Sequence, residues 1–514
     1  MRGPALSRRG FLGGSAVLAS GLIVPQSALA ADEPVKGGNL RLGLGGGSTT
    51  DSIKPGSYND SAMISVAHAL FNGLVEWDAD GKISPELALD WQPKDSAKTW
   101  IVSLRKGIPF SNGKTFDADD AIYSINMHRG KDSKSGAVGA LKEITDVKKI
   151  DANTLEFTLD SPDADFPYVL TDFNVLMVPN GHTDWANPIG TGAFVLEKFT
   201  PGVSISMKAT GHYWKPGRGH VDHVDITIIN DATARLNALI SGQVDAINRV
   251  EPQAVALLEK APNLKIVRAP GGWHAVMAME IDKAPYDNPN LRLALKYAVD
   301  REQILKSLFS GYGTLGNDHP IPRSDPYFNT ELAQRPHDPD KAKFYFKKAG
   351  LTDPAITLQV SDAAFNGAVN MGTLFQASTG NAGIKVNIKK EPADGFWSNV
   401  WLKGPFVASY WGGRAAATQM FTSAYKSKAN WNETHWDNPK FDGLLAMAQA
   451  TTDEAKRKTY LWDMQSMLSN EGGAVIPVFR DWLDGSSKKV GGHTPHGGYD
   501  MDNGMICEKA WLRA

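Results

Sequence analysis

One segment late in the chain combines residue types that can hold a polar ligand. Its members are Trp397, Tyr410, Trp411, Gly412, Gly413 and Arg414. Residues 406–411 read as a strand, and the glycines after it would let a backbone approach a ligand closely. The guanidinium beyond them can form paired hydrogen bonds with a carboxylate or a phosphate, and aromatic rings commonly line such sites. The segment is a candidate ligand site, although clustered tryptophans could equally belong to a core.

Signatures of catalytic sites are poor in the sequence. It contains no G-x-S-x-G, no H-E-x-x-H and no P-loop. Ser103 with Lys106 and Ser111 with Lys114 match the S-x-x-K spacing of penicillin-binding enzymes. The first pair closes a predicted strand and the second lies in a predicted turn, and neither serine opens a helix. We therefore predict no catalytic residue and no enzyme activity.

Two histidine pairs have a spacing that metal ligands use. His220 and His223 fall in a strand-like run, where residues three apart point to opposite faces of a sheet. His493 and His496 have the same spacing. We expect no metal site and no cofactor, although a metal-binding or haem-binding protein stays an alternative. Cys507 is the only cysteine, and its apolar neighbours favour a small buried side chain over a reactive thiol.

Predicted strands and helices alternate along the chain and would position these residues. Strands are predicted at 38–44, 98–104, 155–159, 244–247, 384–388 and 406–411. Helices are predicted from apolar faces and from N-cap residues, which are Asp117, Asp231, Asn288, Asp300 and Asp338. Gly242 and Gly350 would end two of these helices. Short strands alternating with amphipathic helices predict an α/β protein with two lobes.

Charge and length exclude some functions. The chain has 54 basic and 56 acidic residues among 514, and without the first 30 residues the balance is 51 against 56, a net charge of −5. A slightly acidic protein is a poor partner for nucleic acid. About 484 residues are too many for a single hydrophobic core, which predicts two or three lobes. Beyond the first 30 residues, no apolar run is long enough to span a membrane.

The first 30 residues have the order of an export signal. An arginine pair, Arg8 and Arg9, precedes a glycine-rich apolar stretch, and residues 28–30 form a small-residue cleavage site. The pair is typical of a twin-arginine signal, and the apolar stretch is too short and too broken by glycine for a membrane span. We expect a periplasmic mature protein that begins near Ala31. No cysteine stands at the cleavage site, so we expect no lipid anchor.

Several stretches of the sequence match one protein family. They are residues 70–76, 84–91, 104–114 leading to 118–120, 190–194 with 213–214, 238–245, and 290–295 with 298–301. In these stretches the chain resembles the large periplasmic solute-binding proteins of ABC importers, the oligopeptide, dipeptide and nickel-binding group known as extracellular solute-binding family 5. The similarity covers nearly all of the chain after the first 30 residues.

The resemblance implies an α/β, bilobed periplasmic-binding-protein fold of type II, in its large cluster C form, with an extra inserted domain. Lobe I would be discontinuous and comprise residues 31–70, 185–270 and 485–514, the inserted domain 71–184, and lobe II 271–484. A ligand held between lobes joined by two hinge crossings would favour the closed form. The implied partners are a small-molecule or short-peptide ligand and an inner-membrane ABC permease, and we expect a monomer.

The sequence departs from the peptide-binding members of that family at one position. In those members the loop after the equivalent strand generally carries an aspartate for the amino terminus of the peptide, and Arg414 takes the corresponding place here. A cation repels an ammonium group, whereas a guanidinium pairs with an acid. We therefore expect a small polar, acidic solute, such as an opine, an acylated amino acid, a sugar derivative or a modified peptide, flanked by Trp397 and Trp411.

Four further pocket residues are carried over from the resemblance. Ser48 and Thr49 follow the first strand, where family members contact the ligand, and Asn366 and Asn370 align with a ligand-contacting segment at a helix start. Each also has an ordinary structural explanation, because Ser-Thr loops and asparagine caps are common. A secreted hydrolase or a signalling receptor that reuses the fold stays an alternative, since function depends on the site and not on the fold.

Overall fold

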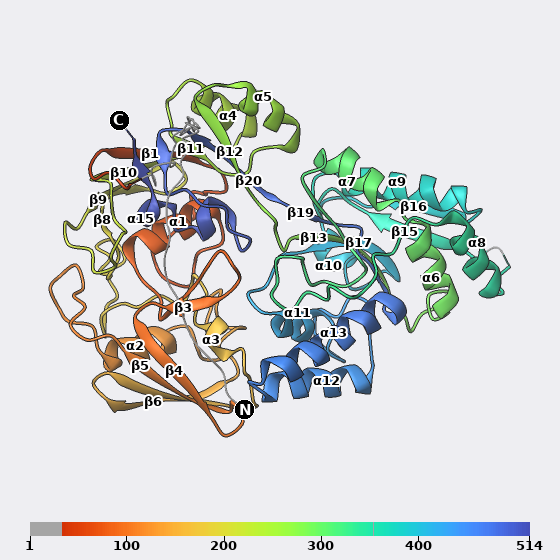
Figure 1. Cartoon of the computed structure of the whole chain (residues 1–514), viewed down its shortest axis with the longest axis horizontal. Helices are drawn as coiled ribbons and strands as arrows, with labels where there is room; N and C mark the ends of the chain where they lie inside the picture. Colours follow the sequence, from red (N-terminus) through yellow and green to blue (C-terminus); the bar gives the residue numbers. More distant parts are fainter. Residues whose placement is uncertain (1–32, 353, 514) are drawn as a thin grey trace, which may run out of the picture. The chain divides into compact units, whose positions relative to one another are not determined.

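Two seven-stranded sheets and one four-stranded sheet organise the chain (Figure 1). The computed structural model describes residues 33–352 and 354–513, so the predicted export signal lies outside the described residues. Both large sheets mix parallel and antiparallel pairs, and helices pack on them, which confirms the predicted α/β class. Among the described residues, no helix is long and apolar enough to cross a bilayer.

The first sheet has the strand order β12-β20-β11-β1-β10-β9-β8. Its strands are β1 (Asn39–Leu44), β8 (Phe194–Thr200), β9 (Ser204–Ala209), β10 (His223–Ile228), β11 (Ala246–Ile247), β12 (Leu264–Ala269) and β20 (Trp482–Ser487). β1 runs parallel to both β10 and β11, so these three strands end at the same edge. Leu40, Leu42 and Leu44 alternate along β1 and are fully buried, which is the period-two pattern of a strand facing a core.

Short helices bury the two faces of the first sheet. They are α1 (Ser61–Leu70), α4 (Ala232–Ile240), η1 (Pro252–Ala254), α5 (Val255–Lys260), α14 (Asp500–Asn503) and α15 (Ile506–Lys509). The paired strands β21 (Val490–Gly491) and β22 (Trp511–Leu512) lie before α14 and after α15 in the chain. The core under α1 and α15 includes Cys507, which is fully buried. The prediction of a small buried cysteine is confirmed, and burial raises the pKa of the Cys507 thiol to about 12.

The second sheet has the strand order β14-β19-β13-β17-β15-β16, and β18 also pairs with β13. Its strands are β13 (His274–Met279), β14 (Gly313–Leu315), β15 (Ile356–Val360), β16 (Val386–Lys390), β17 (Phe406–Trp411), β18 (Ala474–Val475) and β19 (Val478–Arg480). Its helices are α6 (Pro289–Ala298), α7 (Arg301–Phe309), α8 (Pro339–Lys348), α9 (Ala368–Asn381), α10 (Phe396–Asn399), α11 (Ala417–Ala424), α12 (Pro439–Ala450) and α13 (Glu454–Glu471). Every residue of β13 is buried, as expected for a central strand covered on both faces.

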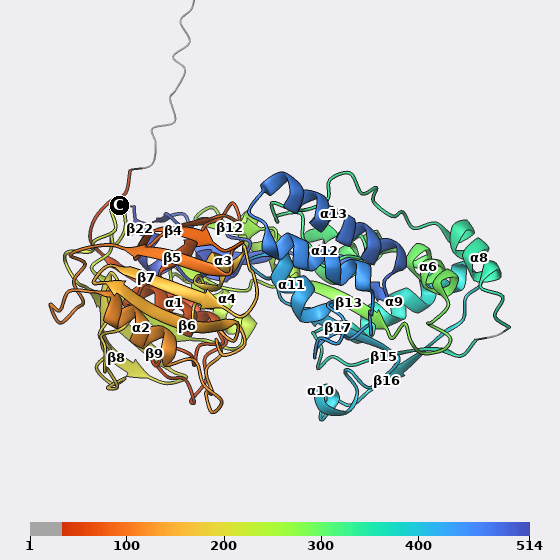
Figure 2. The ribbon, with the colours of Figure 1, turned by 90° about the horizontal axis from the view of Figure 1, so that it is seen from below.

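The four-stranded sheet, of order β4-β5-β7-β6, has a separate core (Figure 2). Its strands β4 (Ala88–Lys94), β5 (Thr99–Leu104), β6 (Ile144–Asp151) and β7 (Thr154–Leu159) follow the paired strands β2 (Val75–Trp77) and β3 (Ile83–Pro85), and its helices are α2 (Ala118–Asn126) and α3 (Phe166–Val169). Asp117 caps α2 in a complete capping box with Asp120, which confirms the predicted cap.

A buried ion cluster fastens this part of the chain to the carboxyl-terminal segment. Nζ of Lys215 lies 2.9 Å from the carboxylate of Glu76, 2.5 Å from that of Glu86 and 3.5 Å from that of Glu508. Arg218 also pairs with Glu76 and Glu508. Although burial acts in the opposite direction, the charges of Lys215 and Arg218 hold the pKa of Glu76 well below its usual range.

The chain crosses between the two large sheets twice. β12 leads to β13 through residues 270–273, and β19 leads to β20 through Asp481. Ala269 lies opposite Trp482 in the first sheet, so both crossings leave that sheet at one place. His274 lies opposite Phe479 in the second sheet, so both crossings also enter that sheet at one place. Two adjacent crossings of this kind can act as a hinge.

Most of the predicted elements are confirmed, and two strands differ. Residues 406–411 form β17 with the predicted bounds, and the predicted caps of α4 and α6 accept hydrogen bonds from the first helical turn. The predicted strand 244–247 shrinks to two residues, because the carboxylate of Asp245 accepts hydrogen bonds from the backbone and guanidinium of Arg41. The predicted strand 384–388 begins only at Val386, because Ile384 still closes the turn after α9 through Thr379.

Candidate functional site

Several segments meet at one edge of the second sheet, where β13 begins. β17 and β19 both run antiparallel to β13, and His274 lies opposite both Trp411 and Phe479. The residues that follow these two strands therefore leave the sheet side by side. They include Arg414 after β17 and Arg480 at the end of β19. In open α/β sheets the carboxyl ends of strands are the usual place for a ligand.

Glycines allow two backbones to touch at this edge. A Cβ atom added to Gly272 would lie 2.7 Å from Cα of Gly413, which is closer than real Cβ contacts allow. Gly413 and Gly272 are thus required by each other's backbone, whatever ligand the site holds. A Cβ atom added to Gly412 would meet only Nη1 of Arg414 at 3.8 Å, so the neighbouring backbone does not require glycine there. Contact of Gly412 and Gly413 with a ligand stays a prediction.

Trp273 organises an aromatic cluster at the same edge. Its ring stacks on Tyr410 with centres 5.5 Å apart, and it meets the edges of Phe309 and Phe365 at 6.1 and 5.3 Å. Trp397 of α10 extends the cluster, because its ring lies 5.9 Å from that of Tyr410. Tyr410 is 38% exposed and Trp397 42% exposed, so two of the predicted aromatic residues offer open ring surface.

Trp411 lies differently from its neighbour Tyr410. It is only 5% exposed, and its indole Nε1 donates a 2.7 Å hydrogen bond to the carboxylate of Glu433. The same carboxylate accepts hydrogen bonds from the indole of Trp401 and the hydroxyl of Ser409. Burial raises the pKa of Glu433 in spite of these donors. The structure therefore makes Trp411 part of a buried network, and its predicted contact with a ligand stays a prediction.

Arg414 has a guanidinium with unused donors. Its Nη1 donates to the carbonyl oxygens of Gly412 and Gly413, and its Cζ lies 5.9 Å from the ring centre of Trp411. Burial lowers the pKa of Arg414, and the charge of Asp172 partly offsets this effect. Within residues 33–352 and 354–513 no carboxylate forms an ion pair with Arg414. Such a side chain can accept an anionic group from outside the protein.

The loop after β1 is held by hydrogen bonds to two asparagine side chains. Gly45 N donates to the side chain of Asn248 at 2.9 Å, and Gly46 N donates to the side chain of Asn230 at 2.8 Å. Ser48, two residues after Gly46, donates its backbone N–H to Asp51, and its hydroxyl oxygen accepts a hydrogen bond from the backbone N–H of Thr50. Ser48 and Thr49 are exposed, so they are free to contact a ligand as predicted, and this contact stays a prediction.

The two predicted asparagines after β15 are exposed. Asn366 lies in the turn before α9, and Asn370 lies in the first turn of that helix. Neither side chain forms a hydrogen bond within the described part of the chain, so both are available to an outside partner. Their role in binding stays a prediction.

The motifs that raised other kinds of chemistry have ordinary partners. Ser103 lies inside β5, and Lys114 pairs with Asp120 of α2 at 2.5 Å. His220 contacts the carbonyl oxygen of Gly217, and His496 contacts that of Trp77. The S-x-x-K and His-x-x-His spacings are therefore parts of turns and packing.

One cluster of ligand-type side chains was not predicted. Nδ1 of His435 lies 2.8 Å from the carboxylate of Asp282, and Nε2 lies 3.4 Å from that of Glu280. One ring nitrogen of His435 and one oxygen of each carboxylate lie within 4.8 Å of one another, a spacing that could hold a metal ion. Exposed acidic groups are common without an ion, and this cluster lies apart from the sheet edge described above.

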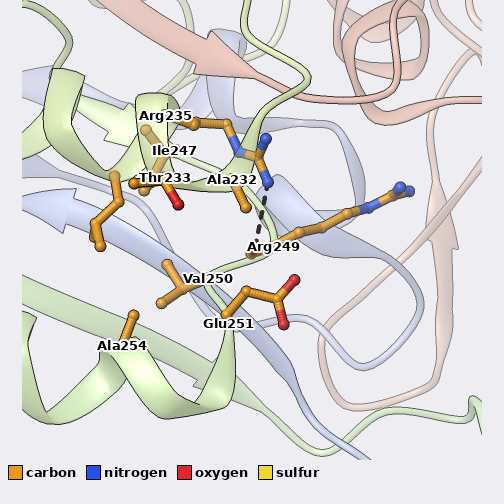
Figure 3. A pocket seen from close by; sticks show the side chains of 9 residues that line it. Ala232, Thr233, Arg235, Ile247, Arg249, Val250, Glu251 and Ala254 are labelled. Atoms are coloured by element: carbon orange, nitrogen blue, oxygen red, sulfur yellow. Dashed lines mark hydrogen bonds between the residues drawn. The ribbon is translucent and has the colours of Figure 1, made fainter. Parts of the chain in front are cut away.

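A small pocket beside α4 does not offer a free charged donor (Figure 3). Arg235 forms part of its wall, and its guanidinium already donates to the carbonyl oxygens of Ile229 and Asn248. Arg249, also in the wall, pairs with Asp500 at 2.9 Å. The edge of the second sheet is therefore the stronger candidate for an acidic ligand.

A buried contact joins α3 to the helices of the second sheet. The guanidinium of Arg457 lies 2.5 Å from the carboxylate of Asp165, which also accepts a hydrogen bond from Thr418. Next to it, Ala164 N donates to the carbonyl oxygen of Gln449 at 2.7 Å. The segment around Ala164 and Asp165 thus contacts the helices that pack on the second sheet.

Sequence reasoning missed Trp273, Arg480 and Trp482. All three belong to the crossings, and they become neighbours only through the pairing of β12 with β20 and of β13 with β19. A signal was present, because Gly271-Gly272-Trp273 mirrors the order of Trp411-Gly412-Gly413. The pairing of these two motifs could have been suspected, but the position of Arg480 could not.

Comparisons with known proteins agree with the resemblance seen in the sequence. The family model described as "Bacterial extracellular solute-binding proteins, family 5 Middle" matches residues 82–433. The glutathione-binding protein GsiB of Pectobacterium atrosepticum is 27% identical over 465 residues, which cover 87% of this chain and 90% of GsiB. Heme-binding protein A of Haemophilus influenzae is 29% identical over 465 residues, which cover 83% of each chain.

A solved structure also matches along nearly the whole chain. The PBP AgaA from A. tumefacien R10, in complex with agropinic acid, has a TM-score of 0.74 and 26% identity. The match covers 93% of this chain and 99% of AgaA. The predicted bilobed fold is therefore confirmed.

Proposed function

Because this chain belongs to family 5 of the bacterial extracellular solute-binding proteins, we propose that it captures a small polar, acidic solute and delivers it to an inner-membrane ABC permease. The observation that carries the proposal is Arg414, a partly buried guanidinium after β17. The charge of Asp172 acts on it, but it has no ion-pair partner among the described residues. An anionic group of the solute would supply that partner.

The aromatic residues beside Arg414 support a solute with an apolar or sugar-like face. Tyr410 and Trp397 keep more than a third of their surface open next to the arginine segment. Flat rings provide a large contact area at a small entropic cost, and they leave the orientation to the charged pair. Ser48, Thr49, Asn366 and Asn370 would add hydrogen bonds from the exposed loops.

The two crossings provide the movement that delivery requires. In this proposal the lobes keep the boundaries predicted from the sequence, except that lobe I resumes at residue 482 and not at 485, because β20 pairs with β12 in the first sheet. The segments near residues 270 and 481 form the hinge. A solute that touches both lobes binds the closed form better than the open form, so binding drives closure. The permease would recognise the closed form, and the solute would leave chemically unchanged.

The relatives do not settle the ligand of this chain. Their names and titles refer to glutathione, heme and agropinic acid, so family membership alone allows very different solutes. The class of solute has to be inferred from the side chains of this chain. Arg414 favours an acid such as an opine, an acylated amino acid or a modified peptide over a peptide with a free amino terminus.

Native mass spectrometry of protein purified from its own host tests the proposal. We expect a retained small molecule with an acidic group, and calorimetry with that molecule should then show that Arg414→Ala costs roughly 2 to 5 kcal/mol of binding free energy. Arg414→Lys should recover only part, because an ammonium cannot form the two-pronged contact. A retained molecule without an acidic group, or an alanine variant that binds within twofold of wild type, would contradict the proposal.

A further inference from the structure

A second guanidinium, that of Arg480, stands at the crossing between the sheets without an acidic partner. Its Cζ lies 4.8 Å from the ring centre of Trp273 and 5.4 Å from that of Trp482. Among residues 33–352 and 354–513 its side chain forms no hydrogen bond and no ion pair, and its Nε is buried without a partner. A charged donor in such a place is costly unless something binds to it.

Two other arginines near the crossings are each paired with an acid. Arg249 lies 2.9 Å from Asp500, and Arg268 lies 2.5 Å from Asp481, the residue that follows Arg480. Asp500 is further engaged, since it accepts a hydrogen bond from Ser61 at 2.8 Å. Asp500 and Asp481 are therefore already paired, and Glu251, whose charge also acts on Arg480, forms no ion pair with it.

The free charge faces the same sheet edge as Arg414. The last residue of β17 and the residue before Arg480 both lie opposite His274. The segment 271–273 runs between them, with Gly272 against Gly413 and Trp273 against Arg480. Two unpaired guanidiniums thus border the start of β13, one on each neighbouring strand.

We propose that Arg480 binds a second anionic group of the solute, so that the ligand class is a small molecule with two acidic groups. This inference rests on the proposed function and adds to it the number of charges and a second anchor. Burial and the charge of Arg249 lower the pKa of Arg480, and the charges of Asp500 and Glu251 offset part of this effect, so Arg480 is buried beside another positive charge. An anion there would relieve that repulsion at the crossing and would favour the closed form.

Thermal unfolding without any solute is the first test, because an unpaired buried charge and a structural cation give opposite results. We expect Arg480→Met to unfold at the same temperature as wild type or higher, since methionine fills the space between the tryptophans without a charge. The control is Arg268→Met. This change removes the ion-pair partner of Asp481 at the same crossing and should lower the unfolding temperature. An Arg480→Met protein that unfolds below wild type by as much as Arg268→Met would overturn the proposal.

Inorganic sulfate is the probe for the second test. Sulfate exchanged for chloride at constant ionic strength should raise the unfolding temperature of wild type in a saturable way. Arg480→Met should lose at least half of that rise, whereas Arg268→Met should keep it. A wild type without a saturable response, or an Arg480→Met variant with the full response, would overturn the second anchor.

The outcomes separate this inference from the proposed function. If the retained molecule carries one acidic group and only the Arg414 variants lose affinity for it, the proposed function stands and the second anchor fails. If the molecule carries two acidic groups and both Arg414→Ala and Arg480→Met bind it at least tenfold more weakly, both are supported. If neither variant changes binding, both fail.

Discussion

The indole Nε1 of Trp411 donates a 2.7 Å hydrogen bond to Oε1 of Glu433, so the residue that ends β17 is tied to the core beneath the sheet edge. Tyr410, one residue earlier, points to the other face and stacks on Trp273. The two residues at the end of β17 therefore have different roles on the two faces of the sheet. Trp411 and Glu433 hold the loop that carries Arg414, and Tyr410 faces the candidate site.

Replacing Trp411 with phenylalanine should therefore reduce stability. The change keeps an aromatic ring but leaves Oε1 of Glu433 without its donor, and an unsatisfied buried acceptor costs about 1 to 3 kcal/mol. The matched control is Trp397→Phe, whose parent is 42% exposed, and this change should stay within about 0.5 kcal/mol of wild type. Urea unfolding measures both. Equal losses in the two variants would show that the Trp411–Glu433 bond does not anchor the strand end.

Two aspartates near the contact between α3 and the second sheet should make stability depend on pH. Burial and the charge of Asp165 raise the pKa of Asp163 to about 7. Burial is the largest cause that raises the pKa of Asp325, also to about 7. In the unfolded chain both titrate near 3.8. The folded state therefore holds more protons between these values, so the free energy of unfolding should fall as the pH rises through this window.

The double variant Asp163→Asn, Asp325→Asn tests that dependence. Asparagine cannot ionise, so the free energy of unfolding of the variant should fall less than that of wild type between about pH 5 and about pH 7.5. These two pH values lie below and above the raised pKa of about 7, and chemical unfolding at each pH measures the difference. Glu302→Gln, a change at an exposed position on α7, should leave the wild-type slope unchanged. A double variant with the wild-type slope would mean that other groups cause the pH dependence.

Lys215 should contribute far more to stability than an exposed lysine in an ion pair. It holds the carboxylates of Glu76 and Glu86, so Lys215→Met leaves buried acids short of a cation and should cost about 3 to 5 kcal/mol. Lys208 pairs with Glu197 at 3.6 Å on the surface, and Lys208→Met should change the free energy of unfolding by less than about 1 kcal/mol. Losses of similar size in the two variants would contradict a special role for the buried cluster.

Local sequence patterns predicted individual strands and helix caps well, but they predicted poorly which distant residues come into contact. The alternation of 406–411 and the cap residues Asp117 and Asn288 act within a few residues of chain, so they could be recognised directly. The side of a strand on which a tryptophan lies depends on a distant partner, and Glu433 is 22 residues from Trp411. Arg480 was missed for the same reason, because only the pairing of β13 with β17 and β19 brings it beside the segment of Arg414. The acids that neutralise Arg249 and Arg268 are equally remote in the sequence.

The first 30 residues lead to the last prediction, which concerns export. Replacing Arg8 and Arg9 with lysine keeps both positive charges and the apolar stretch, so any effect must come from recognition of the arginine pair itself. We expect the double-lysine variant to stay in the cytoplasm with its signal uncleaved, because a twin-arginine pathway reads guanidinium groups and not charge alone. Arg2→Lys, in the same segment but outside the pair, should be exported like wild type. Fractionation followed by mass measurement of the mature amino terminus distinguishes the cases, and cleavage near Ala31 is expected for the exported forms. Normal periplasmic accumulation of the double-lysine variant would rule out the twin-arginine route while leaving secretion by another route intact.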